Sequence, residues 1–250
     1  MIPNWGIGDL TAKAPRRQGA EPRRRQGANP SNPSNPSNPL NPLNPLNPSL
    51  APGPCCRVLY SGNLGFAHRF DAVCAAARRL EETEAGIRFL FVGGGSRLEE
   101  VREVTRGLRS VEFRDYQPRE RLPELYASAD VHLITLRDEI ADCQVPSKYS
   151  SALAAGRPVL LVGGRGSALW EEIVLRRVGW TADHNRDEIR ALLLRVAAYR
   201  DDRELRGLRA RELFEEKYSR PAAMEKWRAV VDGLGECREL GIEGNLKFEI

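Results

Sequence analysis

The sequence predicts an α/β fold, a doubly wound parallel sheet preceded by a disordered N-terminal leader. Two observations predict it. From residue 57 onward, short runs of β-branched and aromatic residues alternate with segments of helical spacing, and this alternation is typical of right-handed βαβ units in a parallel sheet. Residues 1–54 lack this alternation, and proline recurs there at every third position from Pro30 to Pro48.

The expected strands and helices follow one another in a regular order. Strands are expected at 57–62, 86–95, 111–116, 130–136, 157–163 and 178–182. Helices are expected between them at 69–82, 96–108, 119–129, 148–156 and 167–177, and three more over about 186–233. This pattern suits one Rossmann-like domain over residues 55–235, followed by a C-terminal tail at 236–250.

Residues 1–54 are expected to form a disordered linker. Proline fixes φ, has no N–H to donate and disfavours helix in the preceding residue, so the Asn-Pro repeats predict an extended or disordered segment. A solvated spacer is the simplest interpretation, and a proline-rich ligand or an arm for an anionic surface is the alternative. The formal net charge of +4 lies entirely in this segment, so residues 55–250 are neutral overall. A nucleic-acid-binding domain is therefore disfavoured, because such a domain carries a basic surface.

Cysteine usage and hydropathy limit the class of protein further. The five cysteines are scattered, with no Cys-x-x-Cys pair, which is typical of reduced thiols in a cytoplasmic protein. His132 and His184 lack metal-ligand spacing to these cysteines, so no metal site is predicted. No apolar run approaches the roughly 18–20 residues of a membrane span. The N-terminus also lacks the apolar core of a secretory signal, and a cytoplasmic location is expected.

Candidate ligand-binding residues follow the strands, because a doubly wound sheet binds its ligands at the carboxyl ends of its strands. The turn after the first strand contains Gly62, Asn63 and Gly65. Glycine lets backbone N–H groups approach a phosphate, and Arg69 shortly afterwards is a candidate to close on it. The turn matches neither a Walker loop nor a Gly-x-Gly-x-x-Gly fingerprint, so an ordinary strand-to-helix turn is the alternative.

Two further turns carry candidates for the same edge of the sheet. After the second strand, Gly93 and Gly94 allow either a close approach of a ligand or simply a tight turn. After the third strand, Tyr116 and Gln117 are candidates to stack on a base and to hydrogen-bond with it. The alternative for this pair is a helix N-terminus with Pro118 at its first position.

The loop after the fourth strand is long and polar and ends in Pro146, Ser147 and Lys148. Ser147 is expected to cap the following helix. A lysine in the first turn of a helix is unfavourable, because the macrodipole is positive there. A bound anion removes that conflict, so Lys148 is a candidate phosphate ligand, with a solvated side chain as the alternative. His68 is expected either to face the ligand or to cap a helix.

Several of these segments resemble one known family. The similar segments are Val58–Asp71, Ile87–Arg97, Val111–Leu136, Val145–Gly163 and Tyr218–Trp227. They resemble the C-terminal, donor-binding half of GT-B glycosyltransferases of family 4, also called group 1, which are retaining enzymes that often build bacterial surface polysaccharides. The resemblance covers roughly residues 57–232, and its most specific parts are Tyr-Ser-Gly-Asn-Leu-Gly and Val-Pro-Ser-Lys.

The resemblance implies a nucleotide-sugar donor, by analogy a UDP-sugar, with no cofactor and no metal. The implied catalytic residues are Arg69 and Lys148, which would stabilise the leaving nucleotide diphosphate. The implied donor-binding residues are Gly62, Asn63, Gly65, Gly93, Gly94, Tyr116, Gln117, Pro146 and Ser147.

Two positions depart from the family pattern. Many members carry two glutamates eight residues apart around the fourth loop, where this chain has Cys143 and Ser151. Serine cannot bind two ribose hydroxyls as a carboxylate does, so a non-catalytic nucleotide-sugar-binding fragment or a decayed remnant is the alternative function. A related sugar-nucleotide epimerase is a further alternative, although no acid–base set for one is evident.

The start of the chain also resembles the family. Residues 2–5, Ile-Pro-Asn-Trp, are similar to a turn in the linker that joins the acceptor half to the donor half. The resemblance therefore implies that this chain is truncated and lacks the acceptor domain, and that the Asn-Pro repeats are an expansion within the linker. The implied partner is a separate acceptor-domain chain, through which the protein would make peripheral contact with a membrane.

Overall fold

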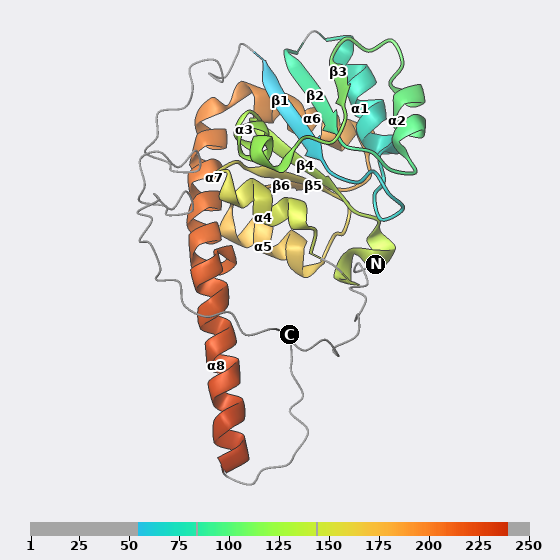
Figure 1. Cartoon of the computed structure of the whole chain (residues 1–250). Helices are drawn as coiled ribbons and strands as arrows, with labels where there is room; N and C mark the ends of the chain where they lie inside the picture. The colour runs from blue at the N-terminus through green and yellow to red at the C-terminus, as the bar shows by residue number, and fades with distance from the viewer. Residues whose placement is uncertain (1–54, 84, 144, 240–250) are drawn as a thin grey trace, which may run out of the picture.

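A parallel α/β sheet with helices on both faces forms the body of the protein, as the sequence predicts (Figure 1). The computed structural model describes residues 55–239 apart from 84 and 144, so the predicted leader lies outside the described residues. Of the predicted tail, 236–250, residues 236–239 belong to a helix and the rest lies outside the described residues. The strands are β1 (Cys56–Ser61), β2 (Ile87–Val92), β3 (Val111–Arg114), β4 (Val131–Thr135), β5 (Val159–Val162) and β6 (Gly179–Ala182).

The order of the strands creates a switch point in the middle of the sheet. All six strands are parallel, in the order β3-β2-β1-β4-β5-β6, so the chain reverses its direction of growth between β1 and β4. β1 pairs with β2 over six positions, but with β4 only through Val58↔Val131 and Leu59↔His132. The carboxyl ends of β1 and β4 therefore separate, and a doubly wound sheet binds its ligand at such a point.

The helices cover the two faces of the sheet according to the alternation of side chains along the strands. The first face is covered by α1 (Asp71–Glu81), α2 (Leu98–Val104) and α6 (Arg186–Ala198). The second face is covered by α3 (Leu122–Ala127), α4 (Ser147–Ala154), α5 (Ala168–Arg176) and α7 (Arg200–Leu213). On β1, for example, Tyr60 packs on the first face and Leu59 on the second.

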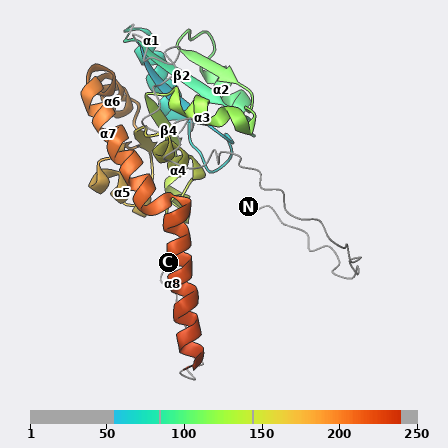
Figure 2. The same cartoon turned by 60° about the vertical axis from the view of Figure 1, so that its left-hand side comes forward.

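The C-terminal part of the described chain leaves the body of the domain. A π-helical turn, Phe214–Tyr218, links α7 to α8 (Arg220–Glu239), and α8 extends away from the sheet in both views (Figures 1 and 2). Met224 and Trp227 on α8 have exposed side chains. No helix in the described part of the chain is both long and apolar enough to cross a membrane.

The boundaries differ from the predicted ones around the third strand. β3 ends at Arg114, so Tyr116 and Gln117 lie in the loop that follows it. A 3-10 helix, Arg119–Arg121, precedes α3, and Pro118 is the residue before this helix rather than its first residue. In the polar loop after β4, a second 3-10 segment spans Asp138–Cys143.

Gly207→Ala tests the packing of α7 on the second face. A Cβ at Gly207 would lie 2.5 Å from the carbonyl oxygen of Gly156, which is backbone and cannot rotate away. Alanine gains about 1 kcal/mol of helix propensity over glycine, whereas overpacking costs about 1–3 kcal/mol, so we expect a net loss in the free energy of unfolding, measured by urea titration. Glu212→Ala, at an exposed position of the same helix, is the control and should change little; a Gly207→Ala protein as stable as the parent would contradict the packing.

Candidate functional site

The loop after β1 is held in place by backbone contacts on one side and a buried tyrosine on the other. The Tyr60 hydroxyl donates to the Asn63 carbonyl oxygen at 2.7 Å. The Leu64 N–H donates to the carbonyl oxygen of Gly94, also at 2.7 Å, and the Leu64 side chain is fully buried. Gly62 has a φ of +128°, a conformation that favours glycine. The predicted glycine loop is therefore a fixed feature at the switch point.

The glycines after β2 make room for this loop. A Cβ on Gly93 would lie 2.2 Å from the Gly62 carbonyl oxygen, and one on Gly95 would lie 2.3 Å from Asn63 Oδ1. The ring of Tyr116 lies over the other side, 3.3 Å from a Cβ built on Gly94. Of the two alternatives for Gly93 and Gly94, the geometry favours a close turn that the first loop packs against.

Lys148 reaches from the first turn of α4 into the switch point. Its Nζ lies 3.2 Å from His68 Nε2 and 5.1 Å from the centroid of the Tyr60 ring. Its aliphatic stem fills the space beside Gly62, where a Cβ would approach Lys148 Cε to 2.9 Å. The structure therefore brings the predicted residues Gly62, Asn63 and Lys148 together at one place.

His68 decides how the Lys148 ammonium is held. His68 Nδ1 lies 2.6 Å from the carbonyl oxygen of Thr135, at the end of β4. A carbonyl only accepts, so Nδ1 carries the proton and Nε2 accepts from Lys148. Burial, and then the Lys148 charge, lower the pKa of His68 to about 4. His68 is thus neutral at pH 7 and caps no helix; it joins β1 and β4 to Lys148.

The charge of Lys148 is not neutralised by the protein. Burial lowers the pKa of Lys148 to about 8. Among the residues that the structure describes, no carboxylate forms an ion pair with its ammonium group. We call the place between the carboxyl ends of β1 and β4 the crevice. At pH 7 it therefore holds a half-buried positive charge whose hydrogen-bond partner is a neutral ring. Such a group is destabilising on its own and favours the binding of an anion.

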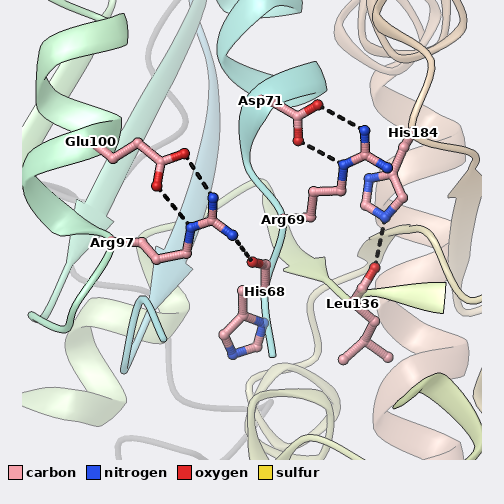
Figure 3. A network of polar contacts seen from close by, with 7 residues as sticks. All are labelled: His68, Arg69, Asp71, Arg97, Glu100, Leu136 and His184. Atoms are coloured by element: carbon pink, nitrogen blue, oxygen red, sulfur yellow. Dashed lines mark hydrogen bonds and ion pairs between the residues drawn. The ribbon is translucent and has the colours of Figure 1, made fainter. Parts of the chain in front are cut away.

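Arg69, the other predicted cation, does not point at Lys148. Arg69 Nε and Nη2 donate to the two carboxylate oxygens of Asp71 at 2.9 and 3.1 Å, on the surface (Figure 3). The hydrogen bond to Asp71 raises the pKa of Arg69. In this structure Arg69 is therefore paired beside the crevice, and it reaches a ligand only after leaving Asp71.

Arg97 is a cation that the sequence prediction did not select. It makes two hydrogen bonds to Glu100, at 2.9 and 2.7 Å, and a third to the His68 carbonyl oxygen at 3.4 Å (Figure 3). Arg97 Nη1 thus contacts the same loop whose His68 ring faces Lys148. The sequence offered only its position two residues after the glycines of the second loop, which does not distinguish it from other surface arginines.

The other predicted residues lie around the crevice with different exposure. Tyr116 is 62% exposed, and its hydroxyl donates to the Gly94 carbonyl oxygen at 3.4 Å. The Gln117 amide donates to the Asp115 carbonyl oxygen and lines a separate hollow next to α3. Tyr116 is therefore available beside the second loop, whereas Gln117 is turned towards another surface.

The start of α4 differs from the prediction by one residue. Ser147 is the first residue of α4 and makes no capping hydrogen bond; the preceding Pro146, which is buried, is in the N-cap position. The prediction of a Ser147 cap is therefore wrong, because the backbone turns helical one residue earlier. Ser147 stays exposed, and its carbonyl oxygen accepts from the hydroxyls of Ser150 and Ser151 at 3.0 and 3.1 Å.

No group of three or more His, Cys, Asp or Glu residues within the described ranges is arranged to hold a metal ion. The crevice is lined by the Lys148 ammonium and by backbone groups of the glycine loops. They suit an oxyanion ligand rather than a divalent cation.

Comparison with known proteins assigns the family. The family model described as "Glycosyl transferases group 1" matches residues 55–197, which include the whole switch point. The chain belongs to this family. It is 37% identical over 100 residues to a protein of Escherichia coli named as a colanic acid biosynthesis glycosyl transferase, WcaI, covering 40% of this chain and 24% of that protein. It is 27% identical over 175 residues to a Pseudomonas aeruginosa protein named as the glycosyltransferase WbjE, covering 69% of this chain and 43% of that protein.

Solved structures share the fold of this group 1 chain. The Staphylococcus aureus protein TarM, in a complex with UDP, superposes with a TM-score of 0.59 at 17% identity, over 70% of this chain and 35% of that one. The C-terminal domain of a group 1 protein of Francisella tularensis, LpcC, gives a TM-score of 0.54 at 15% identity, over 66% and 87%. The chain spans less than half the length of the curated relatives it matches.

Lys148→Met tests the uncompensated charge. Because the pKa of Lys148 is lowered on folding, the unfolded chain binds more protons between about pH 8 and the ordinary value of 10.5. The lysine therefore destabilises the unliganded protein below pH 8, and this cost declines as the pH rises. We expect Lys148→Met to raise the thermal midpoint by about 2–4 °C at pH 7, and by less at pH 10. Lys226→Met, at an exposed position of α8, is the control; a lower midpoint for Lys148→Met would contradict the argument.

His68→Gln tests the neutral histidine. The pKa of His68 is lowered to about 4 in the folded chain. As the pH falls below 6.5, His68 therefore becomes protonated in the unfolded chain while it stays neutral in the folded chain. The resulting loss of stability begins below pH 6.5 and amounts to about 1 kcal/mol per pH unit. Chemical denaturation at pH 7, 6 and 5 should show a shallower pH slope for the variant. His132, whose pKa burial also lowers to about 4, keeps its own contribution; parallel slopes would show that folding does not shift the pKa of His68.

Proposed function

We propose that this chain binds the nucleotide diphosphate of a sugar donor in the crevice between β1 and β4. The observation that carries the proposal is the Lys148 ammonium, which is half-buried, hydrogen-bonded to neutral His68 and without a carboxylate partner in the described part of the chain. The Lys148 side chain lies against the Gly62 loop. The chain also belongs to the group 1 glycosyl transferases. A diphosphate supplies the negative charge that this arrangement lacks.

The donor would be held by the charges of Lys148 and Arg69 and by backbone groups of the loop after β1, with Gly93 and Gly94 forming the turn against which that loop packs. Lys148 would bind a diphosphate oxygen, and Asn63 and Gly65 would offer N–H groups at short range. Gly62 would shape the loop rather than donate, because its N–H already donates to the Val92 carbonyl oxygen. Pro146 and Ser147 would lie beside the phosphates and the sugar. Arg69 would exchange Asp71 for the ligand, because its present ion pair is exposed and weak.

Recognition of the base would fall to the loop after β3. Tyr116 offers an exposed ring beside Gly94, on which a base can stack. Gln117 would have to turn from Asp115 to hydrogen-bond with the base. UDP is the expected nucleotide, since the TarM complex and the complex of Anabaena HepE with UDP and glucose share this fold, the latter with a TM-score of 0.55.

The proposed reaction is transfer of the sugar with retention, as in family 4 glycosyltransferases. Lys148 and Arg69 would stabilise the negative charge that develops on the leaving diphosphate, which is the interaction that lowers the barrier in such a step. The relatives named as WcaI and WbjE are more than twice as long as the part this chain matches. We infer that the acceptor is held by an acceptor domain placed next to the donor site, and that the natural product belongs to a surface polysaccharide.

Donor binding without turnover is the second candidate. The side-chain hydroxyl of Ser151 donates to Ser147 of its own helix, so it does not replace the carboxylate that many family members direct to the ribose. Detectable sugar transfer, with or without a partner chain, would exclude this candidate. Both candidates share the donor site and a cytoplasmic location, which we infer from the free thiols of Cys56, Cys74 and Cys143.

Nucleotide titration of the full chain tests the donor site. We expect UDP to raise the thermal midpoint by several degrees, because saturation at 100-fold over the dissociation constant contributes about 2.7 kcal/mol. Uridine should give a much smaller shift, since it lacks the diphosphate, and GDP and ADP report on the base. Lys148→Met should abolish the shift and Arg69→Ala should weaken it.

Arg102→Ala is the matched control, because Arg102 is an exposed arginine paired with Glu99 on α2. It should respond to UDP as the parent chain does. Absence of a shift with all three diphosphates, in a chain that still unfolds cooperatively, would overturn the proposed function.

A further inference from the structure

A second group of cations lies on the second face of the sheet, near β1, β2 and β3. A hollow of about 490 Å³ lies beside α3 on the second face of the sheet, over β2 and β3. Five of its lining residues are arginines: Arg57, Arg88, Arg109, Arg114 and Arg121. We call it the arginine hollow. Its volume is in the range of pockets that bind small molecules.

The hollow carries an excess of positive charge that its own glutamates do not cancel. Glu112 and Glu124 are its two acidic lining residues, against five arginines. Arg114 is paired with Glu112 at 2.6 Å, and Arg109 with Glu81 at 3.3 Å. Within the described residues, the guanidinium groups of Arg88 and Arg121 have no ion pair. This local excess stands out because residues 55–250 carry no net charge.

The strand register brings two of these arginines side by side. Arg57 and Arg88 are direct partners on the neighbouring parallel strands β1 and β2, and alternation places both on the second face. Like charges in this position repel. Arg57 donates to the Ser128 carbonyl oxygen at 2.9 Å, and the Asp130 carboxylate accepts the main-chain N–H of Arg57 at 2.8 Å. A bound anion would remove the repulsion that remains.

We propose that the arginine hollow binds a small phosphate-bearing anion, independently of the crevice between β1 and β4. Guanidinium groups present paired donors that match phosphate oxygens, and Arg is preferred where such groups are bound in two-point contacts. The ligand chemistry is shared by a soluble phosphate ester and by the head group of an anionic lipid.

The part of the arginine hollow formed by Arg57 and Arg88 is separate from the crevice, whereas Gln117, a residue of the proposed donor site, also lines the hollow. Arg57 and Arg88 stand near the amino ends of their strands, whereas Gly62 follows the carboxyl end of β1. Five residues of extended chain separate Arg57 from Gly62, about 16 Å. One diphosphate group does not bridge that distance, so substitutions in the two places should act on different binding events.

Calorimetric titration of the full chain with inorganic pyrophosphate tests the proposal. We expect Arg88→Ala/Arg121→Ala to weaken one binding event by at least about tenfold, and Lys148→Met to leave that event unchanged. The control is Arg195→Ala/Arg228→Ala, which removes the same charge from exposed positions outside the hollow. If the proposed donor site does not bind pyrophosphate but the hollow does, the titration shows a single binding event. Only Arg88→Ala/Arg121→Ala then weakens it, and Lys148→Met does not.

Two outcomes would overturn the proposal. One is a pyrophosphate titration that Arg88→Ala/Arg121→Ala does not change. The other is an equal loss in the control pair, which would show a response to net charge alone. A parallel arm with phosphatidylcholine vesicles, with and without phosphatidic acid, separates the sources: competition by the acidic vesicles at the hollow identifies a lipid head group, and its absence identifies a soluble phosphate ester.

Discussion

The backbone-to-backbone contact between the loops after β1 and β2 is the constraint on which the crevice depends. With φ values of +128° and +130°, Gly62 and Gly93 meet so closely that any side chain at Gly93 would run into the Gly62 carbonyl. This contact fixes the loop on one side, and the hydrogen bond from the Tyr60 hydroxyl to the Asn63 carbonyl oxygen fixes it on the other. Lys148 then fills the space that a side chain at Gly62 would take. The position of the cation thus depends on the glycines of two loops as well as on α4, which carries it, and on His68.

The crevice is organised around a charge that the protein leaves uncompensated. Thr135 fixes the tautomer of His68, and the free Nε2 of that neutral ring can accept a hydrogen bond but supplies no negative charge. A carboxylate in the place of His68 would stabilise the unliganded protein and would compete with the ligand. The neutral partner orients Lys148 while leaving its attraction for an anion undiminished, at the cost of stability in the empty state.

The sequence predicts the parts of this site whose causes are local. An apolar run ending in glycine marks both a strand and the loop after it, and a lysine in a helical first turn is unusual enough to identify Lys148. The contacts that the sequence does not predict depend on side-chain geometry. Arg69 is held by Asp71, only two residues away, and Arg97 reaches a carbonyl 29 residues earlier in the chain. No periodicity encodes either contact.

The net charge of the domain does not show where an anion can bind. Residues 55–250 are neutral in sum, yet their cations divide into those that have a carboxylate partner and those that do not. Arg69 and Arg97 lie next to the crevice but are already paired with Asp71 and Glu100. Lys148 in the crevice and Arg88 in the arginine hollow have no such partner among the described residues. An anion gains most where it replaces no existing pair, because only there does binding add an interaction without breaking one. An unpaired cation alone does not select a site, since exposed arginines such as Arg119 and Arg195 also lack an ion pair in the described part of the chain. What distinguishes the two proposed places is the burial of Lys148 and the clustering of five arginines around the arginine hollow.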